Sequence, residues 1–161
     1  MRLLTVLTVA GIAGALMLPG QASAQPPGFP DLGPLTDVTA GHPFKNELGQ
    51  EGFIFASPDG FECDGLPGSV FCDGPMPGMG GLTWSPGMGP CDVGRASADP
   101  TWSRFEHFKG VCPPPPGGAV LQPGQKISMG STTCGVLDGD VTACISGDHG
   151  FVIQPSGSFK F

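Results

Sequence analysis

The sequence predicts a mainly β fold: a small antiparallel β domain with three disulfides, Pro/Gly-rich loops and at most one short helix. The 28 glycines and 19 prolines among 161 residues argue against long helices, because these two residues carry the largest helix penalties. Short apolar runs alternate with turn-forming residues, as they do in chains of antiparallel strands. Six cysteines, all beyond residue 60, are typical of a secreted domain held together by disulfides.

The first 24 residues are predicted to be a cleavable signal peptide. Arg2 precedes an almost unbroken apolar stretch that ends at Leu18, and Ala22-Ser23-Ala24 forms a small-x-small cleavage site. No other long apolar segment follows, so we expect no membrane insertion after cleavage. The predicted location is therefore secreted, either extracellular or associated with the cell wall.

The chain after the cleavage site divides by composition. Residues 25–50 are predicted to form an extended Pro/Gly-rich leader, because prolines and glycines cluster there and apolar periodicity is weak. The disulfide-bonded β domain is expected over residues 51–161. Within it, the Pro-Gly-Met repeats of residues 75–90 indicate a low-complexity loop insertion. Residues 113–118, which contain four consecutive prolines, indicate a linker.

The first predicted hairpin has strands over residues 61–64 and 69–73. Pro67-Gly68 lies between them, and Pro-Gly suits the two central positions of a type II turn, where the second residue needs a positive φ. Cys63 and Cys72 are equidistant from this turn. In a hairpin they face each other within disulfide reach, so we expect them to pair.

A second predicted hairpin has strands over residues 131–134 and 141–144. Leu137-Asp138-Gly139-Asp140 lies between them, and Asp-Gly is a strong hairpin signal. Cys134 and Cys144 are centred on Gly139, which indicates a three-residue loop or a bulge and predicts a second pair. The Cys91–Cys112 disulfide then follows by elimination.

The remaining elements are short. Asp99 as the N-cap, Pro100 as the first helical residue and Gly110 as the stop predict one helix over residues 99–110, with a strand as the alternative. Further strands are expected where apolar runs end at turn residues: 53–56, 119–121, 126–129, 150–154 and 158–161.

Several motifs resemble those of small secreted proteins from actinobacteria, above all mycobacteria. They are Phe55-Ala56-Ser57-Pro58-Asp59-Gly60, Cys72-Asp73-Gly74-Pro75-Met76-Pro77-Gly78, Leu121-Gln122-Pro123-Gly124-Gln125-Lys126, Thr133-Cys134-Gly135-Val136 and His149-Gly150-Phe151-Val152, with Phe29-Pro30-Asp31-Leu32 in the leader. The resemblance covers most of the mature chain. It implies export and a common fold, and because these proteins have no established activity it carries over no catalytic residue.

One candidate for catalysis is His149, which follows Asp148 and lies near Ser146. A small extracellular hydrolase or metal-dependent protein using His149 is therefore an alternative hypothesis. Catalytic triads, however, are assembled from separate strands, and the sequence has no Gly-x-Ser-x-Gly motif. Zinc binding would require the widely separated His42, His107 and His149 to converge, because the cysteines are assigned to disulfides.

Three other groups of residues have side chains that suit a ligand. Asp138, Asp140 and Asp148 offer oxygen atoms to calcium, although their spacing is not that of an EF-hand. The thioethers of the Met-rich loop suit extracellular Cu(I) binding, the second alternative. Trp84, Trp102 and Phe105 would suit a face that binds a sugar or a partner, or else belong to the core. The Met-rich loop carries Met76, Met79 and Met88.

The leading hypothesis is a secreted, non-enzymatic cell-envelope or extracellular module with a binding or structural role. The net charge is −7 and basic residues do not cluster, so we expect no nucleic-acid binding, which needs cationic groups against phosphate. No catalytic, cofactor-binding or metal-binding residue is predicted. The expected partner is an unidentified envelope or extracellular ligand, and the expected state is a monomer.

Overall fold

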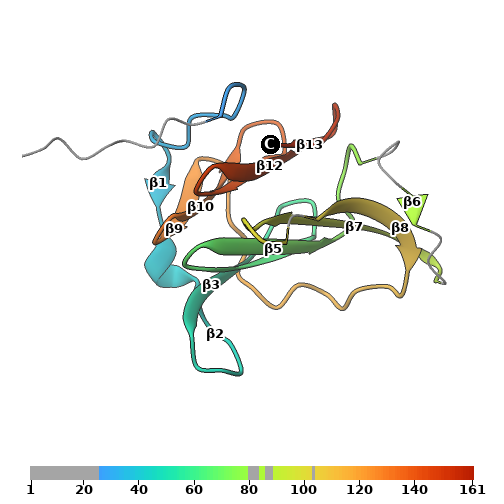
Figure 1. Ribbon diagram of the computed structural model, residues 1–161, viewed down its shortest axis with the longest axis horizontal. Helices are drawn as coiled ribbons and strands as arrows, with labels where there is room; N and C mark the ends of the chain where they lie inside the picture. The colour runs from blue at the N-terminus through green and yellow to red at the C-terminus, as the bar shows by residue number, and fades with distance from the viewer. Residues whose placement is uncertain (1–25, 80–83, 86–88, 103) are drawn as a thin grey trace, which may run out of the picture.

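The computed structural model describes residues 26–79, 84–85, 89–102 and 104–161. The predicted signal peptide lies outside the described residues. Two β-sheets pack face to face (Figure 1), and the single helical element that the described residues contain is a 3-10 turn, η1 (Thr39–Gly41). The prediction of a mainly β domain with three disulfides is therefore confirmed.

The larger sheet has seven strands and is mostly antiparallel. Its short outermost strand β6 is parallel to β8, and every other neighbouring pair is antiparallel. The order across the sheet is β2 (Pro43–Lys45), β3 (Glu51–Ala56), β4 (Glu62–Leu66), β5 (Ser69–Gly74), β7 (Cys91–Ala98), β8 (Phe105–Gly110) and β6 (Trp84–Ser85).

The smaller sheet has six strands and is built around the C-terminal hairpins. Its first strand β1 is parallel to β9, and its other neighbours are antiparallel. The order is β1 (Thr36–Asp37), β9 (Gln125–Met129), β10 (Thr132–Leu137), β11 (Val141–Ser146), β12 (His149–Ile153) and β13 (Phe159–Lys160).

Both predicted hairpins and all three disulfide pairs are confirmed. Leu66 pairs with Ser69 around Pro67-Gly68, and Gly68 has the expected positive φ of 96°. Leu137 pairs with Val141 around a three-residue loop. Cys63 lies opposite Cys72 and Cys134 opposite Cys144, each with Cα atoms 4.1 Å apart, while Cys91–Cys112 joins the start of β7 to the chain after β8.

The core lies between the two sheets and contains both hairpin disulfides. Alternate side chains of the strands in both sheets point inward, so that one face of each sheet is buried against the other sheet. The largest fully buried side chains include Phe53, Phe55, Phe61, Phe151, Leu121, Ile127 and Ile153. Together with Cys63–Cys72 and Cys134–Cys144, these side chains exclude water from the interface between the sheets.

The predicted helix over residues 99–110 is wrong, and the strand alternative is confirmed for Phe105–Gly110, which forms β8. Asp99 does accept hydrogen bonds from the backbone N–H groups of Thr101 and Trp102, at 2.7 and 2.9 Å, as an N-cap would. Here, however, these bonds form a turn between β7 and β8. Phe105 packs against the core, whereas Phe108 lines the outer face, because residues three apart in a strand point to opposite sides of the sheet.

The predicted leader takes part in the fold more than its composition indicates. It supplies β1, β2 and η1, and its Phe29 and Leu32 are buried on the outer face of the six-stranded sheet. Gly135 permits the leader to lie this close to the sheet, because a Cβ atom there would lie only 2.6 Å from the side chain of Leu35 and 3.1 Å from that of Leu32. The leader therefore covers a sheet face that would otherwise be solvent-exposed.

Candidate functional site

The outer face of the seven-stranded sheet carries a regular array of charged and aromatic side chains. Asp64 on β4 lies opposite Phe71 on β5, which in turn lies opposite a β7 serine. One row further along, Glu62 lies opposite Asp73, and Asp73 lies opposite Arg95 on β7. Facing side chains on neighbouring strands contact one another, so these residues form a continuous surface.

This surface is hollowed into a groove. Four cavities, of about 240, 160, 500 and 550 Å³, share lining residues and so adjoin one another across the sheet. Asp64 and Phe71 line both of the two smallest and lie where these meet. We call this feature the sheet-face groove and define it by Glu62, Asp64, Phe71, Asp73, Arg95, Trp102, Phe108 and Pro113–Pro116.

One wall of the groove is the predicted linker 113–118, which we call the proline strap. It follows β8 and runs alongside the seven-stranded sheet (Figure 1). The Glu62 carboxylate accepts hydrogen bonds from the backbone N–H groups of Gly117 and Gly118, the latter at 3.0 Å. Cys112 is tied to Cys91 at the other end. Because both ends are anchored and proline restricts the backbone, the wall is held in place.

Two arginines lie over aromatic rings on this face. The guanidinium of Arg104 lies 4.1 Å from the ring centre of Trp102, and that of Arg95 lies 4.7 Å from the ring centre of Phe108. Trp102 also stacks on Phe71, with ring centres 6.4 Å apart and planes 8° from parallel. Trp102 is still 54% exposed, which is unusual for so large an apolar side chain and leaves it available for contact.

The carboxylates of the groove differ in their partners. Asp73 pairs with Arg95 at 2.6 Å, and Arg104 pairs with Glu106 at 3.1 Å. Among the described residues, Asp64 has no ion pair and no hydrogen bond to another residue. Burial in the groove wall and then the nearby Glu62 raise the pKa of Asp64 above the ordinary aspartate value.

Replacing Asp64 with asparagine is expected to stabilise the protein at neutral pH. Because its pKa is raised, the Asp64 carboxyl group holds its proton more tightly in the folded protein than in the unfolded chain. The contribution of Asp64 to folding stability therefore decreases as pH rises from its unfolded-state pKa to its folded-state pKa. Above the folded-state pKa this contribution is fully unfavourable. The gain from Asp64→Asn in urea unfolding should be larger at pH 7 than at pH 4. An equal or reversed effect at the two pH values would contradict this assignment.

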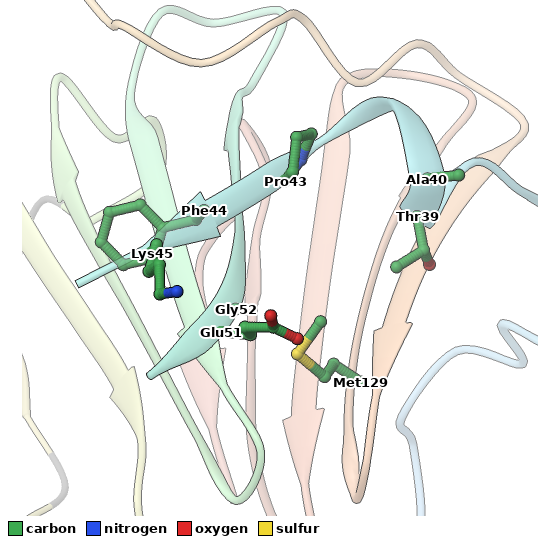
Figure 2. Close-up of a pocket in the computed structure, with 8 residues that line it drawn as sticks. All are labelled: Thr39, Ala40, Pro43, Phe44, Lys45, Glu51, Gly52 and Met129. Carbon is green, nitrogen blue, oxygen red and sulfur yellow. The ribbon is translucent and has the colours of Figure 1, made fainter. Parts of the chain in front are cut away.

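A separate cavity of about 520 Å³ lies at the edge of the sandwich (Figure 2). Met129 reaches it from the six-stranded sheet, while η1, β2 and β3 supply the other residues. Its charged residues, Lys45 and Glu51, face each other across β2 and β3. The lining is mostly apolar, and it lacks the array of aromatic and charged groups that the sheet-face groove provides. The groove is therefore the stronger candidate.

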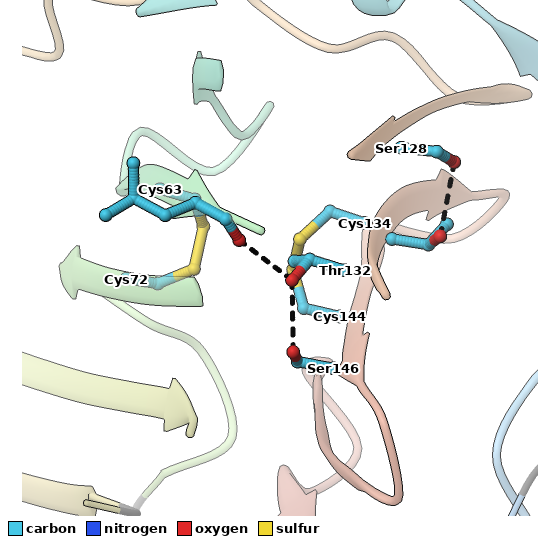
Figure 3. Close-up of a disulfide and its surroundings, with 9 residues drawn as sticks. Cys63, Cys72, Ser128, Thr132, Cys134, Cys144 and Ser146 are labelled. Carbon is cyan, nitrogen blue, oxygen red and sulfur yellow. Dashed lines mark hydrogen bonds between the residues drawn. A yellow bond between two sulfur atoms is a disulfide. The ribbon is translucent and has the colours of Figure 1, made fainter. Parts of the chain in front are cut away.

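Ser146 and His149 are register partners on β11 and β12, but among the described residues no hydrogen bond joins their side chains. The buried Ser146 hydroxyl is 3.0 Å from the Thr132 hydroxyl, which donates to the Leu66 carbonyl oxygen at 2.9 Å (Figure 3). His149 instead lies 3.3 Å from Asp148, whose side chain is 91% exposed. The Ser146 hydroxyl is thus engaged with Thr132, which links the two sheets, and the ion-pair partner of His149 is a solvent-exposed carboxylate of its own turn.

Of the other predicted ligand groups, the aspartates lie at the two ends of one strand and the described methionines lie in the core. Asp140 precedes β11 and Asp148 follows it, so this six-residue strand separates them by roughly 20 Å. Met76 and Met79 are buried in the core, and Met88 lies outside the described residues. The sulfur atoms of Cys63, Cys72 and Cys144 lie within 4.8 Å of one another (Figure 3), but all belong to disulfides and are not thiolate ligands.

The histidines and aromatic candidates are similarly divided. His42 is buried, with its Nδ1 atom 3.2 Å from the Ile54 carbonyl oxygen, whereas His107 lies 3.7 Å from Asp92 on β7. Of the two aromatic candidates whose side chains the structure describes, Trp102 is placed in the groove. Phe105 packs against the core, and Trp84 lies in β6.

Sequence reasoning missed the groove residues on β4, β5 and β7. Asp64 and Phe71 lie in predicted strands, where alternation with the buried Cys63 and Cys72 was a usable signal that they point outward. Arg95 lies in β7, for which no strand was predicted. Its pairing with Asp73 depends on a contact between strands that the sequence does not show locally.

Fold and groove together define a disulfide-bonded β-sandwich with a ligand-sized groove across one outer sheet face. Comparison of the chain with protein-family models, curated proteins and solved structures gave no match. Within the part of the chain that the structure describes, no helix has the length and apolar character needed to cross a membrane.

Proposed function

We propose that the protein is a secreted, non-enzymatic module of the cell envelope or extracellular space that binds its ligand in the sheet-face groove. The observation that carries this proposal is the continuity of the four cavities over a surface of half-buried carboxylates, arginines and aromatic rings. Binding sites are typically concave, with apolar walls and a few polar groups that orient the ligand.

Export is supported by the sequence of the first 24 residues and by the three disulfides. Disulfides form and persist in oxidising compartments outside the cytosol. A binding role without catalysis is supported by the arrangement of the groove, in which Glu62, Asp73 and Arg95 pair with each other or with the proline strap and Asp64 is left for a ligand. The resemblance to secreted mycobacterial proteins agrees with an envelope or extracellular location.

Replacing Trp102 with alanine is expected to weaken binding to an envelope fraction of the producing organism by at least about tenfold. Exposed tryptophans in concave sites commonly contribute the largest share of binding energy. Phe159→Ala is the matched control, since Phe159 is an exposed aromatic residue on the six-stranded sheet, away from the groove. Binding is measured as the fraction of purified exported protein that sediments with the envelope material.

Three outcomes would contradict the proposal. Trp102→Ala could bind as well as the wild type, or Phe159→Ala could lose as much binding as Trp102→Ala. The wild-type protein could also fail to sediment with the envelope fraction. Circular dichroism of each variant verifies that the β fold is retained, so that lost binding is attributed to the groove.

A further inference from the structure

The three aromatic rings of the groove are not equivalent. Trp102 has the guanidinium of Arg104 above it, and Phe108 has that of Arg95. Phe71 is the third ring, and among the described residues no cation lies over it. Its direct neighbour across the strands is the Asp64 carboxylate. The face therefore already holds two cation–π contacts and has a third ring beside an acidic group.

The charges around Phe71 favour an added cation. Glu62, Asp64 and Asp73 line the same cavity as Phe71, and Arg95 neutralises only Asp73. Glu62 is held by backbone N–H groups of the strap, and Asp64 has no cation partner among the described residues. The raised pKa of Asp64 agrees with a carboxylate left without a counter-charge. A bound cation would relieve this cost.

The shape of the cavity suits a long side chain with a charged end. Phe71, Pro113, Pro114 and Pro116 provide apolar walls, and the carboxylates lie among them. Lysine and arginine pack their methylene groups on apolar surface while the charged end makes polar contacts. The adjoining cavities leave room on both sides for the backbone that carries such a side chain.

We propose that the sheet-face groove binds a basic polypeptide segment, one of whose arginine or lysine side chains lies against the Phe71 ring and the Asp64 carboxylate. This inference rests on the proposed function and specifies its ligand class. Charge complementarity favours this ligand over a neutral glycan, because a glycan would leave the Asp64 charge uncompensated. A guanidinium within about 6 Å of the Phe71 ring centre would also gain a cation–π contact.

The test uses a fluorescein-labelled glycine–arginine pentapeptide and fluorescence anisotropy at low ionic strength. The control peptide has citrulline in place of arginine, which keeps the shape and removes the charge. We expect the arginine peptide to bind the exported protein at least about tenfold more tightly than the citrulline peptide. Asp64→Asn should weaken arginine-peptide binding by at least about tenfold, and Phe71→Leu by about threefold or more.

Asp148→Asn is the matched control, since it removes one exposed carboxylate that does not line the groove and should change binding less than twofold. Asp64→Asn is expected to be at least as stable as the wild type, so its lost binding would not reflect unfolding. Equal binding of the two peptides, or unchanged binding by Asp64→Asn, would overturn the inference.

Binding of maltohexaose in preference to the arginine peptide would also overturn the basic-peptide inference, in favour of a glycan. This failure can be distinguished from failure of the proposed function. If Trp102→Ala lost envelope binding while the arginine peptide did not bind, the groove would stand as the binding site and only the ligand class would be wrong.

Discussion

Replacing Cys134 and Cys144 together by alanine is expected to lower the free energy of unfolding by about 4 kcal/mol. The sequence separation of 10 residues gives about 2.7 kcal/mol from the freedom that the unfolded chain regains. The remainder, roughly 1 kcal/mol or more, comes from the space left by two fully buried sulfur atoms in the core. Urea unfolding, followed by circular dichroism, measures the difference.

The valine variant Cys134→Val/Cys144→Val separates the two contributions. Valine restores apolar volume without restoring the covalent link, so it should recover only the part that comes from packing. A loss below about 1 kcal/mol in the alanine variant would contradict the role of this disulfide. Full recovery in the valine variant would show that the crosslink itself contributes nothing.

Phe53→Ala is expected to lower the free energy of unfolding by about 3–5 kcal/mol. Phe53 is fully buried, and its ring folds over Gly65, its partner on β4, where a Cβ atom would lie within 2.6 Å of several ring atoms. Loss of the ring therefore removes both core packing and the cover over a glycine backbone. Chemical unfolding of the purified variant gives the value directly.

Two control variants test whether the effect of Phe53→Ala comes from the core. Phe53→Leu keeps most of the apolar volume and should cost clearly less than Phe53→Ala. Phe159→Ala removes an aromatic ring that is 37% exposed, and should change stability by less than about 1 kcal/mol. Equal losses in Phe53→Ala and Phe159→Ala would mean that the sandwich core is not where the structure places it.

The hairpins were predictable because their signals are local. Pro67-Gly68 and Gly139 select tight turns, and symmetric cysteines around each turn fix the register of the strands. The strand β7 was not predictable in this way. Its residues Cys91–Ala98 include Asp, Gly, Arg and Ser with weak alternation, and it forms a strand because β5 and β8 pair with it on both sides.

The leader and the groove depend on contacts between distant residues. Leu32 is buried because Gly135, about a hundred positions later, leaves room beside it. Trp102 was recognised as a candidate from its residue type alone. Its partner Phe71 and the Asp64 carboxylate come from another hairpin, so the site exists only once β5 and β7 have paired.

The most direct test of the sheet-face groove is to map where the ligand contacts the folded protein. Backbone amide chemical shifts of the exported protein would be followed by NMR during addition of solubilised envelope material. We predict that the largest changes occur on β4, β5 and β7 and in the proline strap. Changes confined to the edge cavity lined by Phe44 and Met129, or to the six-stranded sheet, would contradict the assignment of the groove.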